Sequence, residues 1–170
     1  MKKTIVVLFA SLILGAMGIA PVMAQSGGTD ITTLVAGGSS GNIDSKAAFT
    51  AGASSTITGY VTAVAAVTIG AEAKVSGNVT AGAAFTSGAY SKIKGSISSK
   101  AGFTSGAHST IGGDVTAGAD FTSGDSSVVA GDVYVVGDVT LGAHSKILGS
   151  VHSGSGIIVY GSGATVGSVK

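Results

Sequence analysis

An 18-residue repeat governs nearly the whole of this chain, from residue 31 to its last residue. The phenylalanines after residue 31 lie whole repeats apart, and valine or isoleucine fills the other steps. The resulting apolar column reads Ile31, Phe49, Val67, Phe85, Phe103, Phe121, Val139 and Ile157. Glycine keeps the same period in two further columns, from Gly52 to Gly142 and from Gly41 to Gly167. Several columns in one register indicate a repeat fold and argue against a disordered low-complexity chain.

Within each repeat, apolar or small residues alternate with polar ones, as over residues 85–97. A period of two with many β-branched residues predicts strands, because an amphipathic helix would need apolar spacing near 3.6. The glycine columns predict corners that need unusual backbone angles or a close approach of neighbouring chains. We therefore expect an all-β fold, a single-stranded β-solenoid of 18-residue coils, of which residues 31–170 supply about seven to eight.

The first residues have the pattern of a secretory signal peptide. Met1-Lys2-Lys3 is basic, residues 4–15 are apolar, and Val22-Met23-Ala24 ends in small residues suited to cleavage after Ala24. A membrane anchor is the alternative, but the apolar run is short for a bilayer. We predict a signal peptide over 1–24, a flexible lead-in over 25–30 and a solenoid domain over 31–170. The protein is then secreted to the periplasm, the cell surface or the medium.

The composition excludes several kinds of chemistry. The chain has no cysteine and no arginine, so it has no disulfide framework, no thiolate metal site and no arginine-based recognition of phosphate. Residues 25–170 hold seven lysines and eight acidic residues, a balance that gives no reason to bind nucleic acid. A left-handed hexapeptide acyltransferase shares the period, since 18 is three times six. Such acyltransferases would have Leu, Ile or Val six residues after the apolar column, where this chain has Ser or Ala. No loop offers a catalytic histidine either, so we expect no enzyme.

Three segments share the pattern apolar-x-x-Gly-x-x-small-x-Val/Ile-x-Gly-x-Val/Ile. They are VTIGAEAKVSGNVTA from Val67, FTSGAHSTIGGDV from Phe103 and VTLGAHSKILGSV from Val139. In this pattern the chain resembles the bactofilins over nearly all of residues 31–170. The resemblance implies a right-handed β-helix that polymerises without a nucleotide, through the ends of the solenoid. Bactofilins are typically cytoplasmic, whereas this chain has the pattern of a signal peptide.

Threonine directly follows the apolar column, which should point it outward. This candidate surface ladder comprises Thr32, Thr50, Thr68, Thr86, Thr104, Thr122 and Thr140. Small neighbours such as Ala48, Ala66 and Ala84 predict a flat face, the type of surface found on repetitive ice-binding solenoids. Threonine is also an ordinary outward strand residue that stacks on itself. Binding to ice or to another polymer surface is therefore an alternative function.

Other polar residues give weaker signals. Asp114 and Asp132 share one column, and Asp120 and Asp138 share another, so Ca²⁺ could relieve the repulsion between neighbouring coils. Solvated corner residues are the favoured interpretation, and we predict no cofactor. His108 and His144 share a column two coils apart, about 10 Å, too far for one metal ion. Tyr60, Tyr90 and Tyr134 could contact a glycan, but they fall in different columns or non-adjacent coils.

The last residues continue the repeat. Gly167, Ser168, Val169 and Lys170 are still in register, and only a lysine and a carboxylate blunt the strand edge there. Open edges favour pairing with a further strand. The leading hypothesis is a secreted, non-enzymatic structural protein that associates end to end with copies of itself, into filaments or into envelope or extracellular material.

Overall fold

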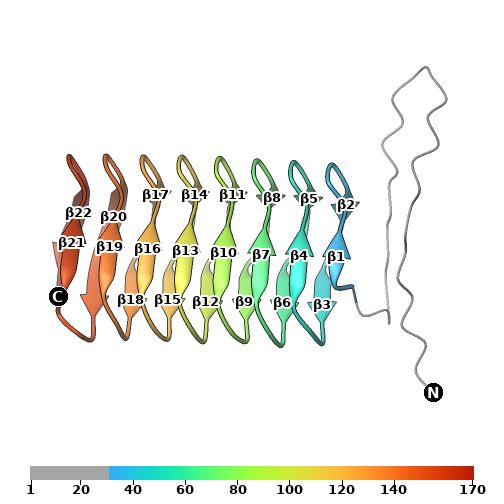
Figure 1. Ribbon diagram of the computed structural model, residues 1–170, viewed down its shortest axis with the longest axis horizontal. Coiled ribbons are helices and arrows are strands. Elements are labelled where there is room, and N and C mark those ends of the chain that lie inside the picture. Colours follow the sequence, from blue (N-terminus) through green and yellow to red (C-terminus); the bar gives the residue numbers. More distant parts are fainter. Residues whose placement is uncertain (1–30) are drawn as a thin grey trace.

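The computed structural model describes residues 31–170, and these form a β-solenoid of eight stacked coils (Figure 1). All the regular structure of this part is strand, and all strand pairs are parallel and lie about one repeat apart. The predicted fold class is therefore confirmed. The predicted signal peptide 1–24 and lead-in 25–30 lie outside the described residues. Residues 31–170 contain no helix that could cross a membrane.

Each coil adds one strand to each of three faces. The first face carries β1 (Thr33–Leu34), β4 (Phe49–Ala51), β7 (Val67–Ile69), β10 (Phe85–Ser87), β13 (Phe103–Ser105), β16 (Phe121–Ser123), β19 (Val139–Leu141) and β21 (Ile158–Tyr160). The second carries β2 (Ser39–Ser40), β5 (Thr56–Ile57), β8 (Lys74–Val75), β11 (Lys92–Ile93), β14 (Thr110–Ile111) and β17 (Val128–Val129). The third carries β3 (Ile43–Ser45), β6 (Val61–Ala63), β9 (Val79–Ala81), β12 (Ile97–Ser99), β15 (Val115–Ala117) and β18 (Val133–Val135). Near the C-terminus, β20 (Lys146–Ser153) and β22 (Thr165–Val169) run through the corner and join the second and third faces.

The core is made of the columns that the period predicts. In β10 and β13 the first and third residues are buried and the middle one is exposed. The ring of Phe103 stacks between those of Phe85, at 5.2 Å, and Phe121, at 4.8 Å between centroids. The serines at the third position of these strands are also buried, which keeps the interior narrow. Apolar ladders of this kind stabilise every coil through its two neighbours.

The backbone conformation at the corners differs from the one that the glycine columns predicted. The left-handed backbone conformation belongs to a column of other residue types, with φ between 54° and 59°: Ser54, Glu72, Tyr90, His108, Ser126 and His144. The glycines of the columns that begin at Gly52 and at Gly41 have no positive φ. Apart from Gly41, they are required by close approach instead; a Cβ on Gly106, for example, would overlap the backbone of Ala89 in the preceding coil. Of the two reasons predicted for these glycines, only close approach is correct.

The terminal coils depart from the period of the inner ones. Thr33, not Thr32, pairs with Thr50, so the step from the first coil to the second is shorter than the repeat by a single position on this face. Val139 pairs with Ile158, a step that is longer than the repeat by a single position. The predicted membership of Thr32 in the threonine ladder and of Ile157 in the core column is therefore wrong. Ile157 is 53% exposed, and Ile158 packs against the core in its place.

Candidate functional site

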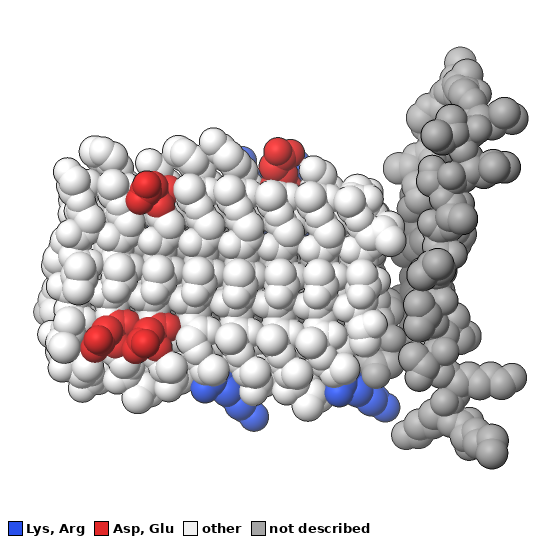
Figure 2. Space-filling view, in the orientation of Figure 1, with Lys and Arg blue, Asp and Glu red and all other residues white. Residues whose placement is uncertain are grey.

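The most regular surface of the protein is the threonine row on the first face. Its members pair in register from coil to coil, and all are exposed: Thr33, Thr50, Thr68, Thr86, Thr104, Thr122 and Thr140. We call this set the threonine ladder. Val159 follows Thr140 and ends it. Figure 2 looks onto this face, where rows of uncharged side chains cover the middle and charged groups lie toward the margins.

The surroundings of the threonine ladder keep it flat over most of its length. The column on one side is glycine from Gly52 to Gly142, and it has no side chain to rise above the threonines. The column on the other side is small at Ala48, Ala66, Ala84 and Gly102 and becomes acidic at Asp120 and Asp138. The face is therefore flat and neutral toward the N-terminus and bordered by carboxylates toward the C-terminus.

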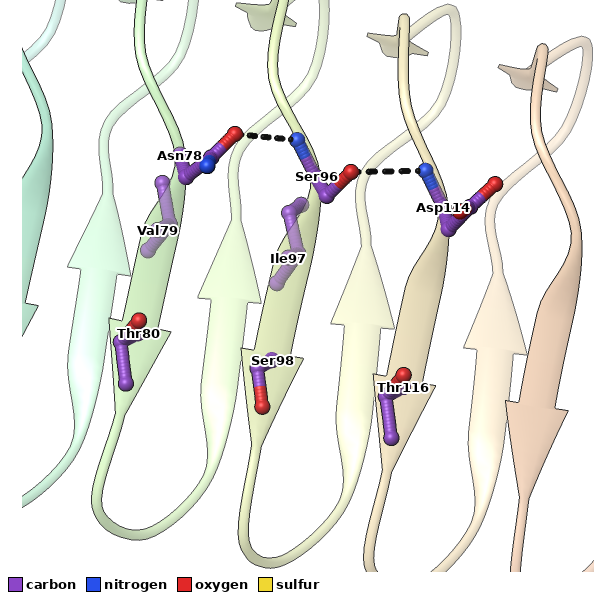
Figure 3. Close-up of a pocket in the computed structure, with 8 residues that line it drawn as sticks. All are labelled: Asn78, Val79, Thr80, Ser96, Ile97, Ser98, Asp114 and Thr116. Carbon is purple, nitrogen blue, oxygen red and sulfur yellow. Dashed lines mark hydrogen bonds between the residues drawn. The ribbon is translucent and has the colours of Figure 1, made fainter.

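A shallow groove lies on the third face, over β9, β12 and β15 (Figure 3). Its floor and walls come from Asn78, Val79, Thr80, Ser96, Ile97, Ser98, Asp114 and Thr116. Along one side, Asn78 Oδ1 accepts the Ser96 N–H at 2.9 Å, and Ser96 Oγ accepts the Asp114 N–H at 3.1 Å. Along the other, the outward hydroxyls of Thr80, Ser98 and Thr116 form a second row, which Tyr134 and His152 continue. This second row of hydroxyl-bearing side chains is shorter than the threonine ladder, and it lies on a different face.

The aspartates hold neighbouring coils together. Asp114 Oδ1 accepts the Asp132 N–H at 2.8 Å, and Asp132 Oδ1 accepts the Ser150 N–H at 2.6 Å. Asp120 and Asp125 bind the N–H of Asp138 and Ala143 in the same way, at 2.9 and 2.8 Å. Each carboxylate thus satisfies a backbone donor of the next coil, a strong type of hydrogen bond. Within residues 31–170, no three Asp, Glu, His or Cys side chains gather as a metal site would require. These hydrogen bonds give the acidic columns a role in coil stacking.

Asp132 is expected to make stability depend on pH. The N–H of Ser150 lowers the pKa of this carboxyl below its ordinary value of 3.8, with a smaller contribution from the Tyr134 hydroxyl. A lowered folded-state pKa contributes stability above the ordinary pKa, and that stability is lost as pH falls through the folded value. Asp132→Asn keeps an oxygen acceptor but cannot ionise. Its melting temperature should lie below that of the wild type at pH 7, and the difference should shrink from about pH 5 to about pH 2.

Thermal melts followed by circular dichroism across that range provide the measurement. Asp138→Asn removes a carboxylate from the same part of the rod without touching the Ser150 hydrogen bond, and it is the matched control. A constant difference between the wild type and Asp132→Asn at every pH would contradict the assignment.

Two of the aromatic candidates form pairs that the sequence reading missed. Tyr90 stacks on His108 at 4.8 Å, and Tyr134 stacks on His152 at 4.5 Å between centroids. Tyr60 instead donates its hydroxyl to Asp44 at 2.8 Å. The members of each stacked pair lie one repeat apart in the sequence. Aligning the aromatic residues by the 18-residue period would therefore have predicted both pairs. His144 is two coils from His108, and the tyrosines lie in separate columns and form no common platform.

The last coil presents an apolar end. β21 pairs only with β19, and β22 only with β20, among the described strands. Tyr160 lies in the inward column of Leu141, but it is 47% exposed where Leu141 is 2% exposed. Val169 is 56% exposed, although Val151, its partner in the preceding coil, is fully buried. Of the predicted assembly edge, Val169 and Lys170 lie on this end, and Ser168 Oγ donates to Ser150 Oγ at 2.8 Å.

Comparison with protein-family models, with curated proteins and with solved structures finds no match to this chain.

Proposed function

We propose that the protein is a secreted, non-enzymatic structural rod that associates with copies of itself through the end of the solenoid. The observation that carries this proposal is the apolar end formed by β21 and β22, where side chains of the inward columns are exposed. Exposed apolar surface beside an unpaired strand edge favours the addition of another strand. Strand addition satisfies the backbone groups of the edge and buries the side chains of the last coil together.

Two features of the sequence support the same role. The repeat resembles that of the bactofilins, whose solenoids polymerise without a nucleotide. The pattern of residues 1–24 adds secretion, so the polymer would form in the envelope or outside the cell. Within the described residues, most aspartates bind the backbone of a neighbouring coil, and His108 and His152 stack on tyrosines, which favours structural roles for these side chains.

Association should depend on the apolar end. We expect the wild type to form assemblies that grow with concentration, whereas Val169→Lys, which places a charge in the contact, should remain monomeric about tenfold higher in concentration. Multi-angle light scattering and negative-stain microscopy measure both. Val64→Lys is the matched control, because Val64 is 67% exposed on the side of the rod. A wild type that stays monomeric at every concentration would overturn the proposal.

The threonine ladder favours a second candidate, adsorption to ice or to another regular surface. Seven threonines repeat at the coil spacing of about 4.8 Å on a face that is flat beside them. If ice is the target, Thr104→Tyr should abolish most of the thermal hysteresis, because one large side chain disrupts the flat surface. Thr110→Tyr, an exposed threonine on the second face, should leave it unchanged. Absence of hysteresis in the wild type would exclude this function.

A further inference from the structure

We propose that copies of this chain join head to tail, with the last coil of one copy against the first described coil of the next, in one fixed register. This inference rests on the self-association proposed above and adds its polarity and its contacts. It comes from irregularities that the first and last coils share and that the six coils between them lack.

The first shared irregularity is a short corner between the second and third faces. In the inner coils, four residue steps separate the two buried positions that flank this corner, as from Ile57 to Val61. The first coil has three steps, from Ser40 to Ile43, because Ser40 pairs with Ile57 and Ile43 with Val61. The last coil also has three, from Val166 to Val169, and its register against β20 shifts at this corner. Two coils of equal corner length can stack here without such a shift.

The second shared irregularity is a glycine at the left-handed corner position. Gly37 in the first coil and Gly163 in the last both have φ of +68°. The six inner coils place serine, glutamate, tyrosine or histidine there, with nearly the same backbone conformation. The two end coils therefore present corners of matching shape with no side chain between them.

The register that aligns these corners also continues the chemical columns across the junction. Tyr160 would lie against Leu34 of the next copy, and Val169 against Ile43, which extends two columns of the core. Ser168 would meet Asn42 in the column where Ser96 and Asp114 already bind each other. Lys170 would meet Asp44, because both continue the outward column of Tyr134 and His152. Opposite charges in adjacent strands favour this pairing.

A contact between two last coils lacks these matches. It would run the strands in opposite directions, so that the columns could not continue, and it would offer no aspartate to Lys170. The head-to-tail junction needs the first coil to be accessible, and the predicted removal of residues 1–24 would leave only the short segment 25–30 before it.

Engineered cysteines test the polarity, because the chain has none of its own. In the proposed junction Val159 and Thr33 of two copies would be strand partners on the first face, about 4.8 Å apart, within the range of a disulfide. The chain is expressed in full from Met1 and purified as the cell releases it. Thr33→Cys and Val159→Cys proteins, mixed and oxidised, should give a cross-linked dimer on non-reducing gels, and neither protein alone should do so.

The possible results separate the two proposals. Dimers from Val159→Cys alone would show tail-to-tail association, and dimers from Thr33→Cys alone would show head-to-head association. Either result would overturn the head-to-tail proposal but would still support self-association. A mixture of Val159→Cys with Thr104→Cys, in the middle of the threonine ladder, is the control for random collisions. A monomeric wild type overturns both proposals.

Charge reversal gives a second test that needs no cross-link. Lys170→Glu should raise the concentration for half-maximal assembly about two- to fivefold, as loss of an exposed ion pair does. Asp44→Lys should raise it similarly, and the double variant should restore it toward the wild-type value. Asp44 also accepts a hydrogen bond from Tyr60, so melting temperatures of all variants verify that the first coil is intact. Additive effects without restoration would overturn the contact between Lys170 and Asp44.

Discussion

Gly106→Ala should destabilise the protein severely, although it adds a single methyl group on a corner. The added Cβ would overlap the backbone nitrogen and Cα of Ala89 and lie against Gly88, all in the preceding coil. Backbone cannot rotate away as a side chain can, so the coils must separate locally or shift. Overpacking of this kind costs about 1–3 kcal/mol in ordinary cores, and we expect the upper end here. The melting temperature should fall by about 10 °C.

Gly41→Ala is the matched control for this prediction. Gly41 belongs to the other glycine column, but it lies in the first coil, and a Cβ there would meet no atom within 4 Å. Its melting temperature should stay within about 2 °C of the wild type. Thermal melts of the three proteins make the comparison. Equal losses in both variants would contradict the assigned cause, because only the Cβ added at Gly106 overlaps the preceding coil.

The repeat predicted the central coils well because each column there reports directly on one position of the cross-section. Phe85, Phe103 and Phe121 recur once in each repeat and stack, and the threonines beside them point outward. The alternation of apolar and polar residues and the 18-residue period suffice to predict which side chains are buried when every coil has the same length. The same reading could have identified the ladder of Asn78, Ser96 and Asp114, since side-chain acceptors in one column lie beside the backbone of the next coil.

The terminal coils could not be read in this way. A residue gained or lost at a corner moves every later residue by one, and only backbone pairing shows where the change falls. The residues before β1 and β21 contain isoleucines at the expected period, Ile31 and Ile157, so the sequence offers a plausible wrong register. The left-handed corners were also hidden, because their column includes Glu72 and Tyr90, which are not residues that indicate a positive φ.

Phe103→Ala should cause the largest loss of stability that one core substitution can produce here. Phe103 is buried and lies between two parallel rings, so truncation leaves a cavity and removes two stacked contacts. Phe→Ala substitutions in cores cost about 3–5 kcal/mol. Since each coil contacts only its neighbours, the cavity should separate the solenoid into two blocks that are coupled less strongly. The urea unfolding transition should shift to lower concentration and become broader.

Phe103→Val provides the control that isolates the cavity from the loss of the ring. Valine already occupies this column at Val67 and Val139, so the backbone of the coil accepts it without strain. We expect Phe103→Val to lose about half as much stability as Phe103→Ala, since the branched side chain fills part of the space. Urea denaturation followed by circular dichroism measures both variants. If valine proved as costly as alanine, the stacked rings themselves, and not the filled volume of the column, would be what couples neighbouring coils.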